Sequence, residues 1–148
     1  MTDFTNPDTI ALRNLFNATT TIALVGASPK PERPSNRVMA FLLARGFHVV
    51  PVNPGQAGGK ILGQKVYAQL TDIPEPVDMV DIFRKSEDAG GIVDEAIAIK
   101  AKSVWLQLNV TDKNAAMRAQ NAGLIAVMDR CPAIEIPQLF VADWRKDS

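Results

Sequence analysis

The chain has 148 residues, of which 47% are hydrophobic, and its 16 basic residues are balanced by 16 acidic ones. This length supports one hydrophobic core, so we expect a single domain over residues 1–148, with an N-terminal helix (1–19), a core (20–140) and a tail (141–148). The balanced charge excludes a whole-protein field that would attract nucleic acid or an anionic membrane surface.

No N-terminal segment has the pattern of a secretion signal, and no apolar run is long enough to cross a bilayer. We therefore expect a cytoplasmic protein with no membrane contact. The sequence contains one cysteine, Cys131, and one histidine, His48. These two residues are too few for a zinc site, and a lone cysteine cannot form an internal disulfide, so no structural metal is expected.

The chain begins with a short amphipathic helix that starts near Asp8. Five short apolar runs then alternate with helical patterns, and runs of this kind are typical of strands covered on both faces. The predicted strands are residues 21–25, 48–52, 77–83, 103–108 and 124–128.

Three helices are predicted between these strands. They span residues 35–45, 86–102 and 111–121, with Ser35, Ser86 and Thr111 as the respective N-caps. Gly46 and Gly123 are expected to end the first and third of them. Residues 53–76 form the longest irregular connection, with a short extended piece near residues 60–62.

This alternation predicts an α/β fold: a doubly wound sheet of about five parallel strands with helices on both faces. Ligands of such sheets bind beyond the carboxyl ends of the strands, where the strand order reverses. The residues that follow each strand are therefore the candidates for a functional site.

The loop after the first strand has the character of an anion site. Gly26, Ala27 and Ser28 permit a tight turn and offer N–H groups and a hydroxyl to phosphate oxygens. The helix that starts near Ser35 points the positive end of its dipole toward the same place. Positive charge is added by Lys30, Arg33 and Arg37.

Two features argue against a dinucleotide. Only Gly26 remains of the three glycines in the dinucleotide fingerprint, and no carboxylate follows the second strand, where NAD-binding proteins grip the ribose. Asn53 and Pro54 stand there instead and form a neutral edge on which an adenine or its ribose can rest. The alternative is that these residues only end the strand in a turn.

The third and fourth strands end in further candidates. Phe83 can flank a base or an apolar ligand arm, and Arg84 can meet a phosphate. Gln107 and Asn109 follow the fourth strand and add amide groups to the same rim. The alternative is a half-buried aromatic ring with solvated charges beside it.

Six segments, taken together and in order, resemble the small stand-alone CoA-binding domain proteins, which are similar to the N-terminal domain of the succinyl-CoA synthetase alpha subunit. The segments are Val25-Gly-Ala-Ser28, Arg33-Pro-Ser35, Pro51-Val-Asn-Pro54, Asp81-Ile-Phe-Arg84, Trp105-Leu-Gln107 and Asp129-Arg-Cys131. The resemblance covers residues 20–140 and implies a Rossmann-like domain that binds coenzyme A. One departure is Asn109, where many relatives have glycine.

The resemblance also implies where the cofactor lies. The phosphates would lie near Gly26, Ala27, Ser28, Lys30, Arg33, Pro34 and Ser35. Asn53 and Pro54 would contact the adenosine, while Phe83, Arg84 and Gln107 would lie along the side of the cofactor.

No catalytic constellation is found, because His48 lies within a strand pattern. Cys131 follows the last strand, where a thiol could meet the sulfur end of such a ligand and exchange disulfides with it, although a lone cysteine is more often a buried apolar residue. Three functions stay open: non-catalytic binding of CoA or an acyl-CoA, an NAD(P)-dependent oxidoreductase, or an accessory subunit whose site a protein partner completes. The apolar segment 134–144 could also support a homo-oligomer, or the same residues could cover the sheet edge.

Overall fold

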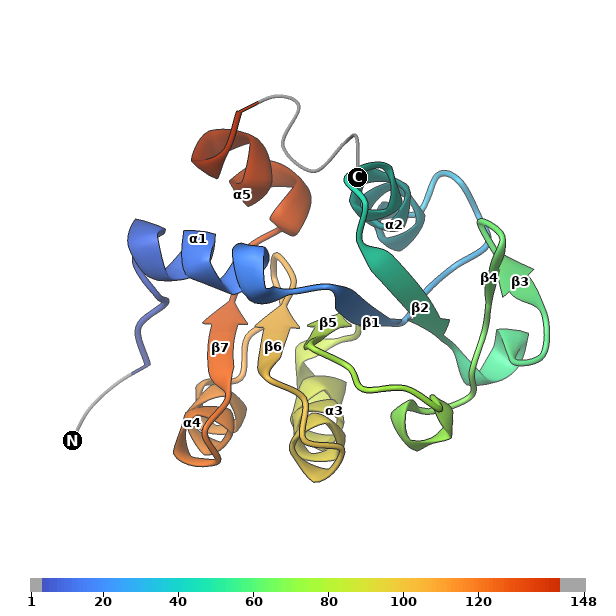
Figure 1. Ribbon diagram of the computed structural model, residues 1–148. Coiled ribbons are helices and arrows are strands. Elements are labelled where there is room, and N and C mark those ends of the chain that lie inside the picture. The colour runs from blue at the N-terminus through green and yellow to red at the C-terminus, as the bar shows by residue number, and fades with distance from the viewer. Residues whose placement is uncertain (1–3, 142–148) are drawn as a thin grey trace.

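A computed structural model of the chain describes residues 4–141 (Figure 1). Its centre is a parallel sheet of five strands in the order β2-β1-β5-β6-β7. The strands are β1 (Thr21–Val25), β2 (His48–Val52), β5 (Met79–Ile82), β6 (Ser103–Leu106) and β7 (Ile125–Met128). The order reverses between β1 and β5, which is the switch point of a doubly wound sheet.

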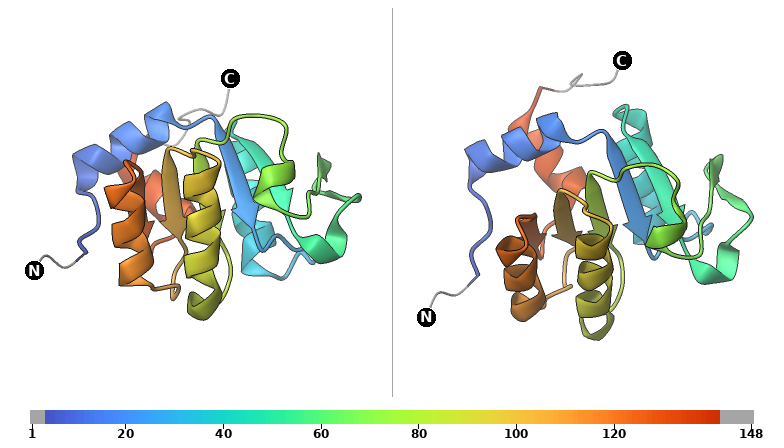
Figure 2. Two further views of the ribbon diagram at one scale, coloured as in Figure 1. Left: turned by 90° about the horizontal axis from the view of Figure 1, so that it is seen from below. Right: turned by 60° about the horizontal axis from the view of Figure 1, so that its bottom comes forward.

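Helices cover both faces of this sheet. On one face lie α1 (Thr9–Ala18), α2 (Pro34–Ala44) and α5 (Pro132–Leu139). Figure 2 shows α3 (Ser86–Ala98) and α4 (Lys113–Asn121) side by side on the other face. The predicted Rossmann-like α/β fold is therefore confirmed.

The long connection between β2 and β5 has little regular structure. It contains two single-turn helices, η1 (Pro54–Gln56) and η2 (Leu70–Asp72), and a two-stranded antiparallel ribbon of β3 (Lys60–Ile61) and β4 (Gln64–Lys65). The ribbon agrees with the extended piece predicted near residues 60–62.

The two helical layers pack on the sheet differently. Beneath α3 and α4 the buried helix residues are mostly small, including Ala89, Ala96, Ala115, Ala116 and Ala119, which allows these helices to lie close to the strands. Under α1, α2 and α5 the core contains large side chains. Phe16 and Trp105 contact each other there, with ring centroids 5.2 Å apart and ring planes tilted by 42°.

Three predicted strands are shorter than expected. β5 begins at Met79 and ends at Ile82, β6 ends at Leu106, and β7 begins at Ile125, while β1 and β2 have the predicted bounds. β5 and β6 end early because the chain must turn at the carboxyl edge. The N–H of Val110 bonds to the carbonyl of Gln107 at 2.9 Å, which closes the turn after β6.

The predicted caps Ser35, Ser86 and Thr111 are wrong. Helix α2 starts one residue earlier, with Pro34 in its first turn. Helix α4 starts later and is capped by Asp112, whose carboxylate accepts the N–H of Ala115 at 3.0 Å. Helix α3 ends at Ala98, before the predicted residue 102.

Ser86 makes bonds to another segment in place of a cap. Its hydroxyl donates to the carbonyl of Asn109 at 3.3 Å and accepts the N–H of Thr111 at 2.9 Å. This hydroxyl joins the start of α3 to the loop that follows β6. Asp8, in contrast, caps α1 as predicted, accepting the N–H of Ala11 at 2.9 Å.

The edge strand β7 is partly closed by the N-terminal segment. The side-chain amide of Asn6 donates to the carbonyl of Met128 at 2.9 Å and accepts its N–H at 2.8 Å. A side chain thus completes the bonding of one residue at an exposed sheet edge, where unpaired backbone groups invite association.

Of the predicted tail, only Val141 lies within the described residues, and the C-terminal end of the segment 134–144 lies outside them. No helix within residues 4–141 combines the length and apolarity needed to cross a bilayer. The same part of the chain has no group of three or more His, Cys, Asp or Glu side chains placed to hold a metal ion.

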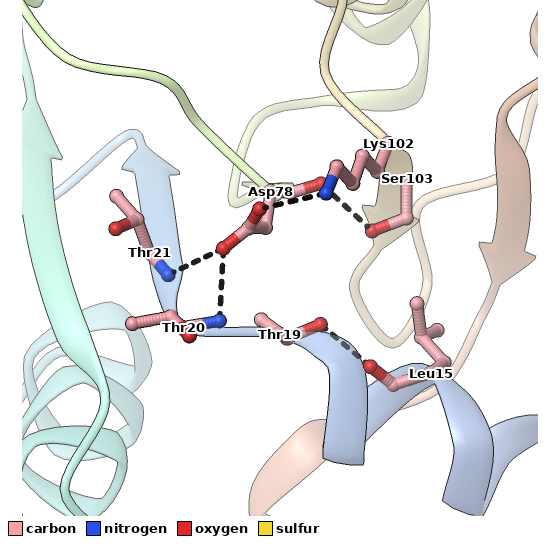
Figure 3. Close-up of polar contacts among 7 residues, drawn as sticks. All are labelled: Leu15, Thr19, Thr20, Thr21, Asp78, Lys102 and Ser103. Atoms are coloured by element: carbon pink, nitrogen blue, oxygen red, sulfur yellow. Dashed lines mark hydrogen bonds and ion pairs between the residues drawn. The ribbon is translucent and has the colours of Figure 1, made fainter.

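The amino ends of the strands are joined by Asp78, on the sheet edge opposite the predicted site (Figure 3). Its Oδ2 accepts the N–H groups of Thr20 and Thr21, each at 2.9 Å. Its Oδ1 lies 3.9 Å from the ammonium of Lys102. One carboxylate therefore connects the starts of β1, β5 and β6.

Replacing Asp78 with alanine should lower the free energy of unfolding by about 1 to 3 kcal/mol, because two backbone donors lose a charged acceptor. Urea denaturation followed by circular dichroism measures this loss. Glu95→Ala, an exposed carboxylate on α3, is the matched control and should change stability by less than about 0.5 kcal/mol. Equal values for the two variants would contradict this role for Asp78.

Candidate functional site

The switch point between β1 and β5 lies under the turn at Gly26. This glycine has φ of +90°, and a Cβ atom built on it would overlap the carbonyl oxygen of Phe83 and lie 3.1 Å from Cδ of Arg84. Only glycine permits this conformation and this approach together. The loops after β1 and β5 therefore meet backbone to backbone.

The turn at Gly26 presents fewer free donors than its sequence suggests. The N–H groups of Gly26 and Ala27 both point to the carbonyl of Val52, at 3.0 and 3.4 Å. The Ala27 side chain is 1% exposed and lies in the core. The expectation that these two N–H groups are available to a phosphate is therefore corrected: they hold the loop against β2.

Asn53 fixes the same loop from the second strand. Its amide donates to the carbonyl of Ala27 at 2.7 Å and accepts the N–H of Gly55 at 2.9 Å. Each end of its side chain thus makes one bond within the protein, which leaves the second amide N–H and the second lone pair of the oxygen for a ligand.

A small cleft of about 250 Å³ opens beside this turn. It is lined by Gly26, Ser28, Arg33, Pro34, Ser35 and Phe83. Within residues 4–141 the backbone N–H groups of Ser28 and Ser35 have no hydrogen-bond acceptor. These donors, the guanidinium of Arg33 and the positive end of the α2 dipole make the small cleft suited to an anion.

A large cleft of about 590 Å³ adjoins the small one and shares Pro34 and Phe83 with it. Its other lining residues are Val38, Arg84, Lys85, Gln107, Leu108, Asn109, Val110 and Cys131. Most of this wall is apolar, with two cations at the side where α3 begins. Arg84 also lies 3.5 Å from Asp88 in an exposed ion pair.

The far wall of the large cleft is formed by the loops after β6 and β7. Asn109 has φ of +69° and donates its N–H to the carboxylate of Asp129 at 2.8 Å. Asp129 itself has φ of +60°. Asparagine and aspartate tolerate this left-handed conformation better than other residues with a Cβ, which allows the loops after β6 and β7 to turn sharply at the rim.

Two polar side chains, one in β5 and one in the turn after β6, have unmet hydrogen-bonding capacity. Asp81 is 0% exposed in the middle of β5, between Leu24 of β1 and Trp105 of β6. Neither of its carboxyl oxygens has a partner among the described residues, and the same holds for Oε1 of Gln107. Burial raises the pKa of the Asp81 carboxyl well above its usual value, which favours the neutral acid.

The structure brings most of the predicted site residues together. The small cleft is lined by Gly26, Ser28, Arg33, Pro34 and Ser35. Phe83 lines both clefts, and Arg84 and Gln107 line the large one. Among the described residues, Ala27, Lys30, Asn53 and Pro54 line neither cleft.

Val38, Val110 and Asp81 also belong to this region, although none of them was predicted as a site residue. The two valines belong to apolar patterns that predict only core. A signal existed for Asp81, because a carboxylate inside the apolar run Met79-Val-Asp-Ile82 must be buried on one face of a doubly covered strand.

His48 lies at the opposite edge of the sheet from both clefts. It begins β2, at the amino ends of the strands, and its Nε2 lies 2.7 Å from the carboxylate of Glu75. The histidine is therefore a surface residue of the opposite sheet edge. Cys131, in contrast, is 7% exposed and lines the large cleft.

Residues 20–137 match the model of the CoA-binding domain family, and the chain belongs to that family. The protein YneT of Bacillus subtilis is 30% identical to it over 126 residues, which is 85% of this chain and 92% of YneT. A hypothetical protein from Pyrococcus horikoshii OT3 is similar in structure, with a TM-score of 0.85 and 39% identity over 94% of this chain and 99% of that one.

The chain is also similar to one region of larger CoA ligases. An acetyl-coenzyme A synthetase of Ca. Korarchaeum cryptofilum aligns with a TM-score of 0.67 and 26% identity, over 80% of this chain and 28% of that one. The family predicted from the six sequence segments is thus confirmed.

Proposed function

We propose that this protein binds coenzyme A or an acyl-CoA, without catalysing a reaction, across the two clefts at the carboxyl ends of the strands. The observation that carries the proposal is the pairing of a small, donor-rich cleft with a large, mostly apolar one that shares Pro34 and Phe83 with it. Coenzyme A has the same two parts, an anionic phosphate end and a long neutral arm.

The phosphates fit the small cleft by charge. Arg33 supplies a guanidinium, and the free N–H groups of Ser28 and Ser35 add neutral donors. Lys30 lies in the same loop and is exposed, so its charge adds to the local field rather than to the cleft wall.

The adenosine is assigned to the edge formed by Asn53 and Pro54, after β2. Contact there comes from packing against the ring of Pro54 and the backbone of η1, and from the second N–H of the Asn53 amide, because the first N–H is bonded to Ala27. No carboxylate follows β2 to repel the phosphate on the ribose, which favours CoA over NAD.

The pantetheine arm is assigned to the large cleft. Its volume of about 590 Å³ is within the range of small-molecule sites. Phe83 and Val110 offer apolar surface to the arm, and Gln107 offers an amide. Lack of catalysis is proposed because His48, the sole histidine, lies at the opposite edge of the sheet.

Replacing Arg33 with alanine should weaken CoA binding by about 1 to 3 kcal/mol, roughly 5- to 150-fold in Kd, because a charge-assisted phosphate contact is lost. Arg84→Ala should have an effect of the same direction. Titration calorimetry with CoA measures both changes.

Arg118→Ala is the matched control, since this arginine pairs with Asp94 at 3.0 Å on the other face of the sheet. Its Kd should equal that of the wild type. CoA titrations that do not change in Arg33→Ala and Arg84→Ala would remove both arginines from the site.

A further inference from the structure

Cys131 is the one thiol of the chain, and it lies at the end of the large cleft formed by the loop after β7. Its residue is 7% exposed, and it immediately precedes α5, whose first-turn N–H groups, from Ile134 and Glu135, bond to its carbonyl at 3.0 and 2.9 Å. The thiol is therefore on a rigid element at the wall of the cleft.

A second feature of the same cleft points to a ligand. Gln107 lines it and is 5% exposed, yet its buried Oε1 has no donor among residues 4–141. A buried acceptor without a partner costs stability, so the site is incomplete until a donor reaches it. A pantetheine arm carries two amide N–H groups and ends in a thiol, and both kinds of group suit this wall.

The order of residues along the clefts fits a ligand that ends at Cys131. The anionic end belongs to Arg33 and Ser35, the two clefts join at Pro34 and Phe83, and Gln107 and Cys131 lie in the large cleft only. An arm that leaves the small cleft therefore enters the large cleft at the shared residues Pro34 and Phe83, and Cys131 lies in the wall of the large cleft.

We propose that Cys131 exchanges disulfides with the thiol end of coenzyme A, an inference that rests on the proposed binding of CoA. The Cys131 thiolate attacks one sulfur of CoA disulfide, the oxidant of the reaction. The S–S bond of that disulfide breaks and a Cys131–CoA disulfide forms. The second CoA leaves as a thiolate and takes up the proton that Cys131 has lost.

Cys131 is the residue before the first turn of α5, and the exposed residue Arg130 precedes it. Anchoring of the phosphates would hold the attacked sulfur beside the thiolate and raise its effective concentration.

The test is intact-protein mass spectrometry of the folded chain after incubation with CoA disulfide, with glutathione disulfide as comparator. We expect a mass gain of one CoA less two hydrogen atoms, located on Cys131, absent from Cys131→Ser and removed by dithiothreitol. The reaction should be at least about tenfold faster with CoA disulfide than with glutathione disulfide. It should also slow in Arg33→Ala, which leaves the thiol in place.

No adduct, or equal rates with the two disulfides, would overturn the proposal. Titration of reduced CoA into Cys131→Ser separates this failure from that of the proposed function. If CoA binds to this variant while the wild type forms no adduct, only the exchange is refuted. If neither binding nor adduct is found in folded wild-type protein, as judged by circular dichroism, both proposals fail.

Discussion

Gly26→Ala is expected to lower the free energy of unfolding by about 3 kcal/mol or more. The new methyl group would meet the carbonyl oxygen of Phe83, which belongs to the backbone and cannot rotate away. The φ of +90° adds conformational strain for any residue with a Cβ. The two loops would have to separate at the switch point.

Chemical denaturation measures this loss, and Gly91→Ala is its control. Gly91 lies in α3, and a Cβ built there has no atom within 4 Å. The same substitution should therefore stabilise the protein by about 0.5 to 1 kcal/mol, because alanine favours the helix. If both variants were as stable as the wild type, the close contact between the loops would be disproved.

Asp81→Asn, unlike Gly26→Ala, is expected to raise the free energy of unfolding at neutral pH. Because burial raises the pKa of this carboxyl in the folded state, the folded protein keeps a proton that the unfolded chain has lost. Keeping that proton costs free energy wherever the unfolded carboxyl is ionised. The amide of asparagine has a similar shape and does not titrate.

The sign of the pH dependence follows from the same shift. The pKa of this carboxyl in the unfolded chain is about 4. Below that pH Asp81 is protonated in both the folded and the unfolded state, so its titration does not change the free energy of unfolding. As the pH rises from there toward the folded pKa, the folded state binds more protons than the unfolded state. The free energy of unfolding should then fall by up to about 1.4 kcal/mol per pH unit through this group.

Urea denaturation of the wild type and of Asp81→Asn between pH 4 and 8 measures the difference. The gap between the two should widen as the pH rises. Asp72→Asn, which removes an exposed carboxylate of η2, should follow the wild type at every pH. A constant gap between wild type and Asp81→Asn would show that the buried carboxyl does not titrate as inferred.

The ends of the strands were predictable where glycine, asparagine or proline follows the strand at the edge of the sheet. β1 ends before Gly26 and β2 before Asn53-Pro54, and both have the predicted bounds. The helix caps were less predictable, because a serine or threonine at the right position also bonds to other segments. Ser86 uses its hydroxyl to join two loops, which no local pattern could reveal.

The candidate site was predictable as a set of loops but not as a set of donors. Sequence alone indicates that Gly26-Ala-Ser28 offers N–H groups, but the engagement of two of them by Val52 depends on strand pairing. The departure at Asn109 has a physical explanation in its φ of +69°, a conformation that glycine adopts freely and asparagine tolerates. The unpartnered oxygens of Asp81 depend on the neighbours that three strands supply.

The most direct test of CoA binding is thermal unfolding of ligand-free wild-type protein with CoA, dephospho-CoA, NAD or NADP. A ligand present at about 100 times its Kd adds roughly 2.7 kcal/mol, which raises Tm by several degrees in a chain of this size. We predict a rise in Tm with CoA that is smaller with dephospho-CoA and absent with NAD and NADP. A rise with NAD or NADP and none with CoA would contradict the account.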